Sequence, residues 1–270
     1  MNRKNLLLFC ILFVSLNLSL ACVSAVEENS TNKTNNATDT NKTHNAADTN
    51  KTNNVTTTNK SGSNIPSSGI YSSKVLGKNS NGYVKCIELG NRSSKVKIAY
   101  IIGIHPREYK PHKALYKQLL AKSKSGKLKY RYFIYNVTVT KNSFNFKVGR
   151  MSGQLLAKKY ILPHAKKAGY NLVVDIHSTA GPAVGYKKKY FINAPLNEQK
   201  SKKIAKKLIN SISGLSYYYP KVQTSPPYCT NPLVKSGTKT IVYETYKYES
   251  QSTTNKRIGT LINAVDKVFR

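Results

Sequence analysis

The chain has 270 residues, a length that accommodates one or two domains. Lysine and arginine number 44 against 11 aspartates and glutamates, giving a formal net charge of +33 at pH 7. No segment beyond the first 25 residues has the length and apolarity of a membrane-spanning helix, which excludes a protein built of several such helices. So large a positive charge favours an anionic partner, such as an acidic polymer or a membrane surface, and a solvated charged surface without such a partner is the alternative.

The first 25 residues have the layout of a secretory signal peptide. A basic start is followed by a largely apolar run from Leu6 to Leu20, and Val23-Ser24-Ala25 forms a small-residue cleavage site. We therefore expect a secreted or cell-surface protein. An uncleaved N-terminal membrane anchor is the alternative.

Residues 26–68 are rich in asparagine, threonine and lysine and almost lack large apolar side chains. Such a segment cannot bury enough surface to offset the entropy of ordering, so we expect a disordered linker. N-x-S/T sequons occur at Asn29, Asn32, Asn36, Asn41, Asn50, Asn54 and Asn59. They suggest a glycosylated stalk, and a plain linker with chance sequons is the alternative.

Residues 69–270 alternate between strand-like and helix-like patterns, and form the predicted folded domain. Apolar or alternating runs predict strands over 83–89, 96–104, 130–139, 171–176, 186–192 and 240–246. Helices are predicted over 112–122, 150–168, 197–212 and 257–269, with Pro163 breaking or kinking the second. This alternation predicts a three-layer α/β/α sandwich around a mixed, mostly parallel sheet.

Two cysteines, Cys86 and Cys229, remain once the predicted signal peptide is removed. In an oxidising compartment two such thiols form a disulfide, and we expect that pairing.

Histidine and acidic residues fall where the predicted strands end. His105 and Glu108 follow one buried strand, His177 follows another, and Glu244 lies within a third. In α/β sheets the active site lies at the carboxyl ends of strands. Two histidines and a glutamate leave a fourth position open for water in a tetrahedral zinc site, so we predict one Zn²⁺ held by His105, Glu108 and His177. Two structural histidines are the alternative.

Asp175 lies two residues before His177, so both side chains share one face of a strand. We expect Asp175 to accept a hydrogen bond from the ring N–H of His105 and so fix its tautomer. A turn-capping role is the alternative.

Three motifs together resemble the zinc carboxypeptidase superfamily, which includes the aspartoacylase and succinylglutamate desuccinylase branch. Gly103-Ile104-His105-Pro106-Arg107-Glu108 resembles its first metal-binding motif, and Asp175-Ile176-His177-Ser178-Thr179 resembles the segment with its third ligand. Ile241-Val242-Tyr243-Glu244-Thr245 resembles its strand with the catalytic glutamate. The resemblance implies an α/β/α fold, one zinc ion and hydrolysis of an amide bond.

The family's Asn-Arg pair for the substrate carboxylate is absent as such. Arg150 is the first candidate to bind a carboxylate or stabilise an oxyanion, and Arg107, between the ligands, is the second. A plain surface cation is the alternative for Arg150.

These features predict a secreted zinc-dependent metallopeptidase or amidohydrolase. Zinc would activate a water molecule that attacks the carbonyl, with Glu244 as general base and then general acid. The expected substrate is a peptide or an anionic cell-wall polymer, with peripheral association at the cell surface, and nucleic acid is not the proper ligand. The alternatives are an N-acyl amino acid deacylase of the aspartoacylase type and a non-catalytic surface-binding protein.

Overall fold

The computed structural model describes residues 65–223 and 225–269. The predicted signal peptide and most of the predicted linker lie outside these residues. Among the helices of the described part, none combines the length and the apolar composition needed to cross a membrane.

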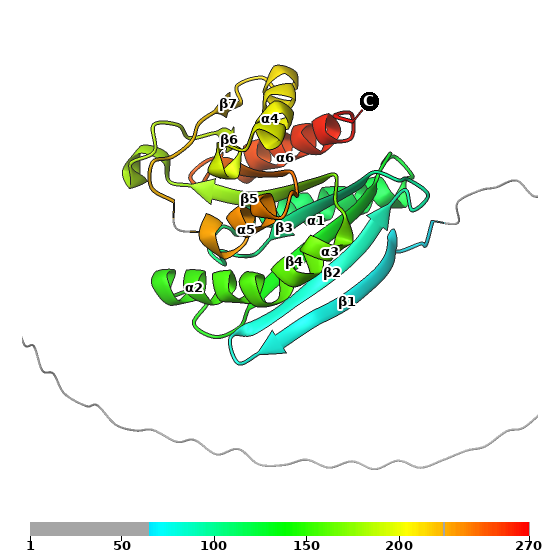
Figure 1. Cartoon of the computed structure of the whole chain (residues 1–270), viewed down its shortest axis with the longest axis horizontal. Coiled ribbons are helices and arrows are strands. Elements are labelled where there is room, and N and C mark those ends of the chain that lie inside the picture. Colours follow the sequence, from blue (N-terminus) through cyan, green and yellow to red (C-terminus); the bar gives the residue numbers. More distant parts are fainter. Residues whose placement is uncertain (1–64, 224, 270) are drawn as a thin grey trace, which may run out of the picture. The chain divides into compact units, whose positions relative to one another are not determined.

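An eight-stranded mixed sheet forms the centre of the described part (Figure 1). Its strands are β1 (Ile70–Asn79), β2 (Gly82–Gly90), β3 (Lys97–Ile102), β4 (Arg131–Val139), β5 (Leu172–Thr179), β6 (Phe191–Asn193), β7 (Ser216–Tyr217) and β8 (Thr240–Tyr246). Their order across the sheet is β1-β2-β4-β3-β5-β8-β6-β7. The central strands β4, β3, β5 and β8 run parallel, whereas β1, β2 and β6 join by antiparallel pairs. The predicted mixed, mostly parallel sheet is confirmed.

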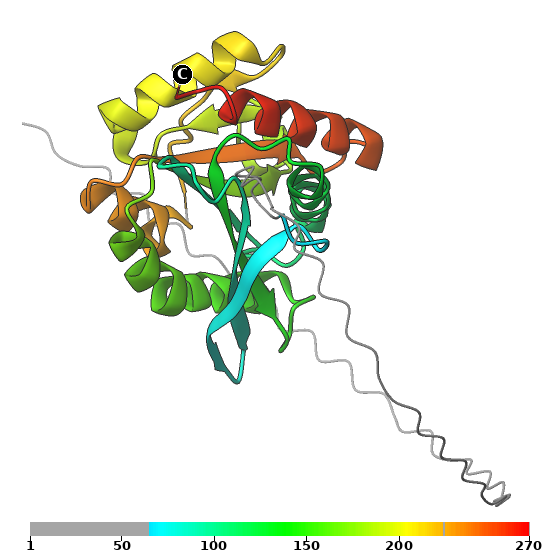
Figure 2. The same ribbon diagram turned by 90° about the vertical axis from the view of Figure 1, so that its right-hand side faces the viewer.

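Helices cover both faces of this sheet (Figure 2). They are α1 (Tyr109–Lys124), α2 (Phe146–Leu156), α3 (Leu162–Ala168), α4 (Gln199–Ser211), α5 (Thr230–Lys235) and α6 (Gln251–Val265). Helices α1, α4 and α6 pack on one face and share a hydrophobic cluster with it, while α2, α3 and α5 contribute to a second cluster on the other face. The result is the expected three-layer α/β/α sandwich.

Alternation along the strands assigns each side chain to one of the two clusters. In β5, Val174 and Ile176 belong to the cluster of α1, α4 and α6, whereas Val173 belongs to that of α2, α3 and α5. Asp175 and His177 follow Val173 in steps of two, so they lie on its face. The candidate site therefore lies on the α2 side of the sheet.

Several element boundaries differ from those predicted. Strand β1 was not predicted, and the predicted strand over 186–192 is reduced to Phe191–Asn193. Helix α6 begins at Gln251 because Ser250 caps it, its hydroxyl accepting a hydrogen bond from the Thr253 amide. The predicted break at Pro163 takes the form of a π-helical turn over Ala157–Ile161, just before the proline.

Candidate metal centre

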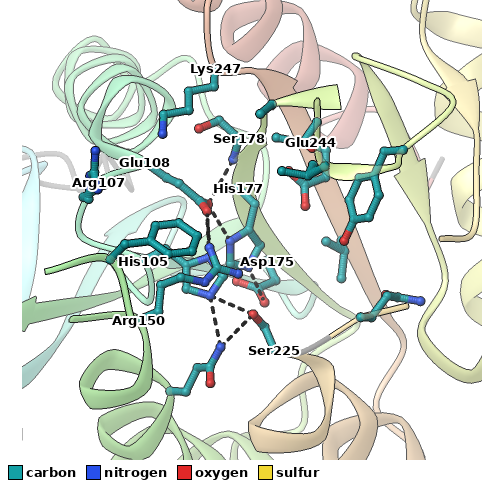
Figure 3. A pocket seen from close by; sticks show the side chains of 18 of the residues that line it. His105, Arg107, Glu108, Arg150, Asp175, His177, Ser178, Ser225, Glu244 and Lys247 are labelled. Atoms are coloured by element: carbon teal, nitrogen blue, oxygen red, sulfur yellow. Dashed lines mark hydrogen bonds and ion pairs between the residues drawn. The ribbon is translucent and has the colours of Figure 1, made fainter. Parts of the chain in front are cut away.

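His105, Glu108 and His177 meet at the carboxyl ends of β3 and β5 (Figure 3). Nδ1 of His105 lies 2.8 Å from Oε1 of Glu108, and Nδ1 of His177 lies 2.9 Å from Oε2 of the same carboxylate. Candidate ligand atoms of all three residues lie within 4.8 Å of one another, and all three side chains are buried. This triad is consistent with a single metal site.

The donor set fits zinc in kind and in orientation. Two imidazole nitrogens and one carboxylate are ligands of catalytic zinc sites. Each histidine turns Nδ1 towards Glu108 and engages Nε2 elsewhere: Nε2 of His177 lies 3.0 Å from Oδ2 of Asp175, and Nε2 of His105 lies 2.7 Å from Oγ of Ser225. These outer contacts fix both rings with Nδ1 facing the position that a cation would take.

Two glycines allow the backbone before His105 to take its path. Gly103 has a φ of 84°, and a Cβ there would collide with the carbonyl oxygen of Val137. Gly153 in α2 packs against the carbonyl oxygen of Ile104, where a Cβ would also collide. Helix α2 can therefore approach the turn that carries His105 only because residue 153 is a glycine and has no side chain.

Burial and mutual contact set the charges within the triad. Burial alone would raise the pKa of Glu108, but the charges of His105 and His177 and their hydrogen bonds hold that pKa well below its usual range. Burial would lower the pKa of His177, but Asp175 and Glu108 raise it well above the ordinary value. Burial lowers the pKa of His105. The site is a dense set of coupled charges.

Asp175 contacts a different histidine from the one predicted. We expected it to hold His105, but its carboxylate pairs with Nε2 of His177. The reason is local geometry, because residues two apart on one strand project from the same face. The other oxygen of Asp175, Oδ1, is buried without a hydrogen-bond partner.

Ser225 contacts His105 instead, and Gln154 donates a hydrogen bond to Ser225; neither residue was predicted. Nε2 of Gln154 lies 3.0 Å from Oγ of Ser225 and 3.3 Å from Nε2 of His105. Gln154 comes from α2 and Ser225 from the loop before Pro226. The sequence carries no signal for this contact, since a serine and a glutamine far apart in the chain form no recognisable motif.

The two predicted arginines take different positions. Nη1 of Arg150, near the start of α2, lies 2.9 Å from Oε1 of Glu108, and a quarter of its side chain is exposed. Arg107 is exposed, and its guanidinium lies 5.9 Å from the centre of the Phe146 ring. Both side chains line the cavity beside the triad, but only Arg150 contacts a triad residue.

Glu244 pairs with His177 in the register of β5 and β8, so the two residues lie side by side on neighbouring strands. Its Oε2 is buried without a hydrogen-bond partner. Burial raises the pKa of Glu244 to about 8, against the lowering effect of His177. Glu244 lines a cavity of about 600 Å³ together with the triad, Asp175 and Ser225.

The expected disulfide is not formed. Cys86 and Cys229 are both free and buried in the hydrophobic cluster of α2, α3 and α5. Burial raises the pKa of Cys86 to about 12 and that of Cys229 well above its usual value. The two thiols act as small apolar side chains in this core.

No protein-family model matches the sequence, and no curated protein matches it. Solved structures match the fold. A Burkholderia mallei protein assigned as a carboxypeptidase is 13% identical with a TM-score of 0.50, and the match covers 75% of this chain and 63% of that one. A metallo-carboxypeptidase from Burkholderia cenocepacia is 12% identical with a TM-score of 0.50, and the match covers 76% of this chain and 66% of that one. Thrombin activatable fibrinolysis inhibitor is 12% identical with a TM-score of 0.51, and the match covers 74% of this chain and 68% of that one.

The chain thus spans less than two thirds of the length of either Burkholderia protein. Within that span it has the fold of the zinc carboxypeptidases, as the sequence motifs predicted. This fold carries a His-Glu-His triad consistent with one metal ion.

Proposed function

We propose that the protein is a zinc-dependent hydrolase of amide or peptide bonds. The observation that carries this proposal is the position of Glu244, a half-buried residue whose Oε2 is buried without a partner. It lines the same cavity as the triad and lies beside His177 in the sheet. If His105 and His177 served only to stabilise the fold, the unpaired carboxylate of Glu244 beside them would have no role. A hydrolase uses it to move a proton.

His105 and His177 would each hold the ion through Nδ1, and Glu108 would hold it through a carboxylate oxygen. Bound zinc supplies Lewis-acid chemistry towards a carbonyl oxygen and lowers the pKa of water. With the ion bound, Asp175 would keep the proton of His177 on Nε2 and Ser225 would accept the Nε2 proton of His105, so that both Nδ1 atoms would present lone pairs to the ion.

Glu244 is the proposed proton carrier. Without a cation its pKa is raised to about 8, so it is mostly protonated at neutral pH. A cation held by the triad favours the carboxylate and makes it a base. Glu244 would then take a proton from the attacking water and deliver it to the leaving nitrogen.

Arg150 is the proposed anion-binding residue. Its guanidinium is already in the cavity, in contact with Glu108. From α2 it can bind a substrate carboxylate or stabilise the negative charge that develops on the carbonyl oxygen. Arg107 lines the same cavity and is the second cation available for this role.

We further propose that the protein acts outside the cell, on peptides attached to an anionic surface polymer. The signal-peptide pattern and the net charge of +33 support this proposal. The test is incubation of purified cell-surface polymer with the zinc-loaded protein, followed by mass spectrometry of released fragments. Release by the wild type and not by Glu244→Gln is expected. Equal release by both, or by neither, would contradict the proposal.

A further inference from the structure

A second open groove, of about 900 Å³, adjoins the candidate metal centre. Pro106, Arg107, Ser143 and Lys247 line both hollows. In Figure 3, Arg107 and Lys247 lie at one edge of the site, away from Ser225. The two hollows therefore adjoin at these four residues.

One face of α1 forms a side of the groove. Tyr109, Lys113, Tyr116 and Lys117 all line it. Lys113 lies four residues after Tyr109, and Tyr116 and Lys117 lie three and four residues after Lys113, which places all of them on one side of a helix. Leu115 and Leu119 on the opposite side are buried in the core. The groove face of α1 thus carries the exposed Tyr109, Lys113 and Lys117, together with Tyr116, which is half-buried against the core.

The charge of the groove is entirely positive. Its cations are Arg107, Lys113, Lys117 and Lys247, and no aspartate or glutamate lines it. Within the described residues, the ion pairs with carboxylates use other cations, namely Arg92, His105, Arg131, Arg150, His177 and Arg257. The groove cations therefore have no anionic partner in that part of the chain.

The acidic side chains of the described part are committed elsewhere. Each one is buried or half-buried, and none is exposed. All of them except Glu244, which lines the cavity beside the triad, have partners within the fold. Examples are Glu88 with Arg131, Glu249 with Arg257, Asp266 with Tyr132, and Glu198 as the cap of α4. Within residues 65–223 and 225–269, therefore, no carboxylate neutralises the groove cations.

Exposed aromatic rings flank the same groove. Phe144 is 91% exposed and Tyr109 is 60% exposed, and both line it. Large apolar rings left open to water beside a hollow are typical of a surface that contacts a ligand.

We propose that this groove binds an acidic peptide segment of the substrate, continuous with the bond held at the metal centre. The inference rests on the proposed function, because it places the amide bond of the substrate at the triad. The same substrate chain then continues from that bond into the groove. The unpaired cations select carboxylates by charge, and the aromatic rings pack against the extended segment between them.

The experiment measures binding rather than hydrolysis. The full chain carrying Glu244→Gln, which leaves the probe intact, is titrated against fluorescein-labelled hexaglutamate by fluorescence anisotropy. A groove variant, Lys113→Glu/Lys117→Glu, is compared with a control variant, Lys203→Glu/Lys206→Glu. The control lysines are exposed on α4 and line neither hollow, and the change in net charge is the same in both.

The Kd for hexaglutamate should rise about tenfold in the groove variant and less than about twofold in the control. Hexaglutamine should bind more weakly than hexaglutamate. Phe144→Ala offers a second variant that changes no charge, and it should also weaken binding. Circular dichroism melting checks that each variant is folded.

Equal losses in the groove and control variants would overturn the proposal, since they would mean that only the overall charge attracts the probe. Binding of hexathymidylate as tight as that of hexaglutamate, and equally sensitive to the groove variant, would overturn the assignment to a peptide. Groove-dependent binding by a protein that neither holds zinc nor hydrolyses peptides would leave the groove standing and refute the proposed function alone.

Discussion

The carboxylate of Asp175 lies 3.0 Å from Nε2 of His177, and the opposite ring nitrogen of that histidine lies 2.9 Å from Glu108. His105 has the same arrangement with a neutral partner, Ser225, in place of the carboxylate. The two histidines of the triad are therefore held by partners of different charge. A charged partner strengthens the basicity of a metal-bound imidazole more than a hydroxyl does.

We predict that Asp175→Asn weakens zinc binding by about 10- to 100-fold, since it removes the negative charge behind His177. Ser225→Ala is the matched change at His105. It should weaken binding less, because the hydroxyl that it removes is uncharged and is a weaker acceptor than a carboxylate. Competition with a chelator of known affinity measures both constants. An effect of Ser225→Ala equal to or larger than that of Asp175→Asn would contradict the unequal roles.

Gly153→Ala should destabilise the protein by about 1–3 kcal/mol, because the added methyl group collides with the backbone carbonyl of Ile104. Helix propensity alone predicts the opposite sign. Gly259→Ala in α6 is the control, since the nearest atom there is the movable end of the Gln118 side chain. Urea unfolding gives both free energies. A Gly153→Ala protein as stable as the control variant would show that α2 can move away from the His105 turn at no cost.

Acid should destabilise the fold through His112. Burial lowers the pKa of His112 to about 4, and Nε2 lies 2.8 Å from the carbonyl oxygen of Ile176, to which it donates as a neutral ring. Between pH 6.5 and 4 the unfolded chain binds a proton at this residue and the folded chain does not, so stability falls as the pH falls. From pH 7 to pH 5 the loss amounts to about 2 kcal/mol.

His112→Gln retains an amide donor for the Ile176 carbonyl and cannot titrate. Denaturant unfolding of the metal-stripped protein at pH 7 and pH 5 should show a smaller loss in the variant than in the wild type. The other histidines are common to both proteins and cancel in the comparison. Equal losses in the two proteins would show that His112 does not titrate in this range.

The two core thiols should resist alkylation in the native protein. Cys86 and Cys229 are buried, and the raised pKa of each keeps it protonated. Iodoacetamide labelling followed by peptide mass spectrometry should find neither peptide modified before unfolding and both modified afterwards. Peptides linked through these residues, about 2 Da lighter than the sum of the reduced pair, would instead establish the disulfide.

The sequence predicted what depends on a local pattern. Apolar runs located the central strands, and because their polar residues fall at the strand ends, His105, Glu108 and His177 could be expected to meet. Strand β1 was missed because its middle, Ser72-Ser73-Lys74, is polar and exposed at the edge of the sheet. An edge strand buries too little to leave an apolar signature.

The partners of the histidines were less predictable. Asp175 was expected to contact His105, and nothing in a D-x-H pattern says which of two neighbouring rings the carboxylate will reach. Ser225 lies 120 residues from His105 and Gln154 lies 49 residues away, so only the packing of α2 and of the loop before Pro226 brings them together. The disulfide prediction relied on the number of cysteines and the compartment, which do not determine whether two thiols bond.

The most direct test of the central claim measures bound metal and peptide hydrolysis on the same preparations of wild type and Glu244→Gln. We predict about one zinc per chain in both proteins, with hydrolysis in the variant reduced by about 10²- to 10⁴-fold, because the ligands are intact and only the proton carrier is lost. A folded wild type that binds no metal, or a Glu244→Gln protein as active as the wild type, would contradict the account.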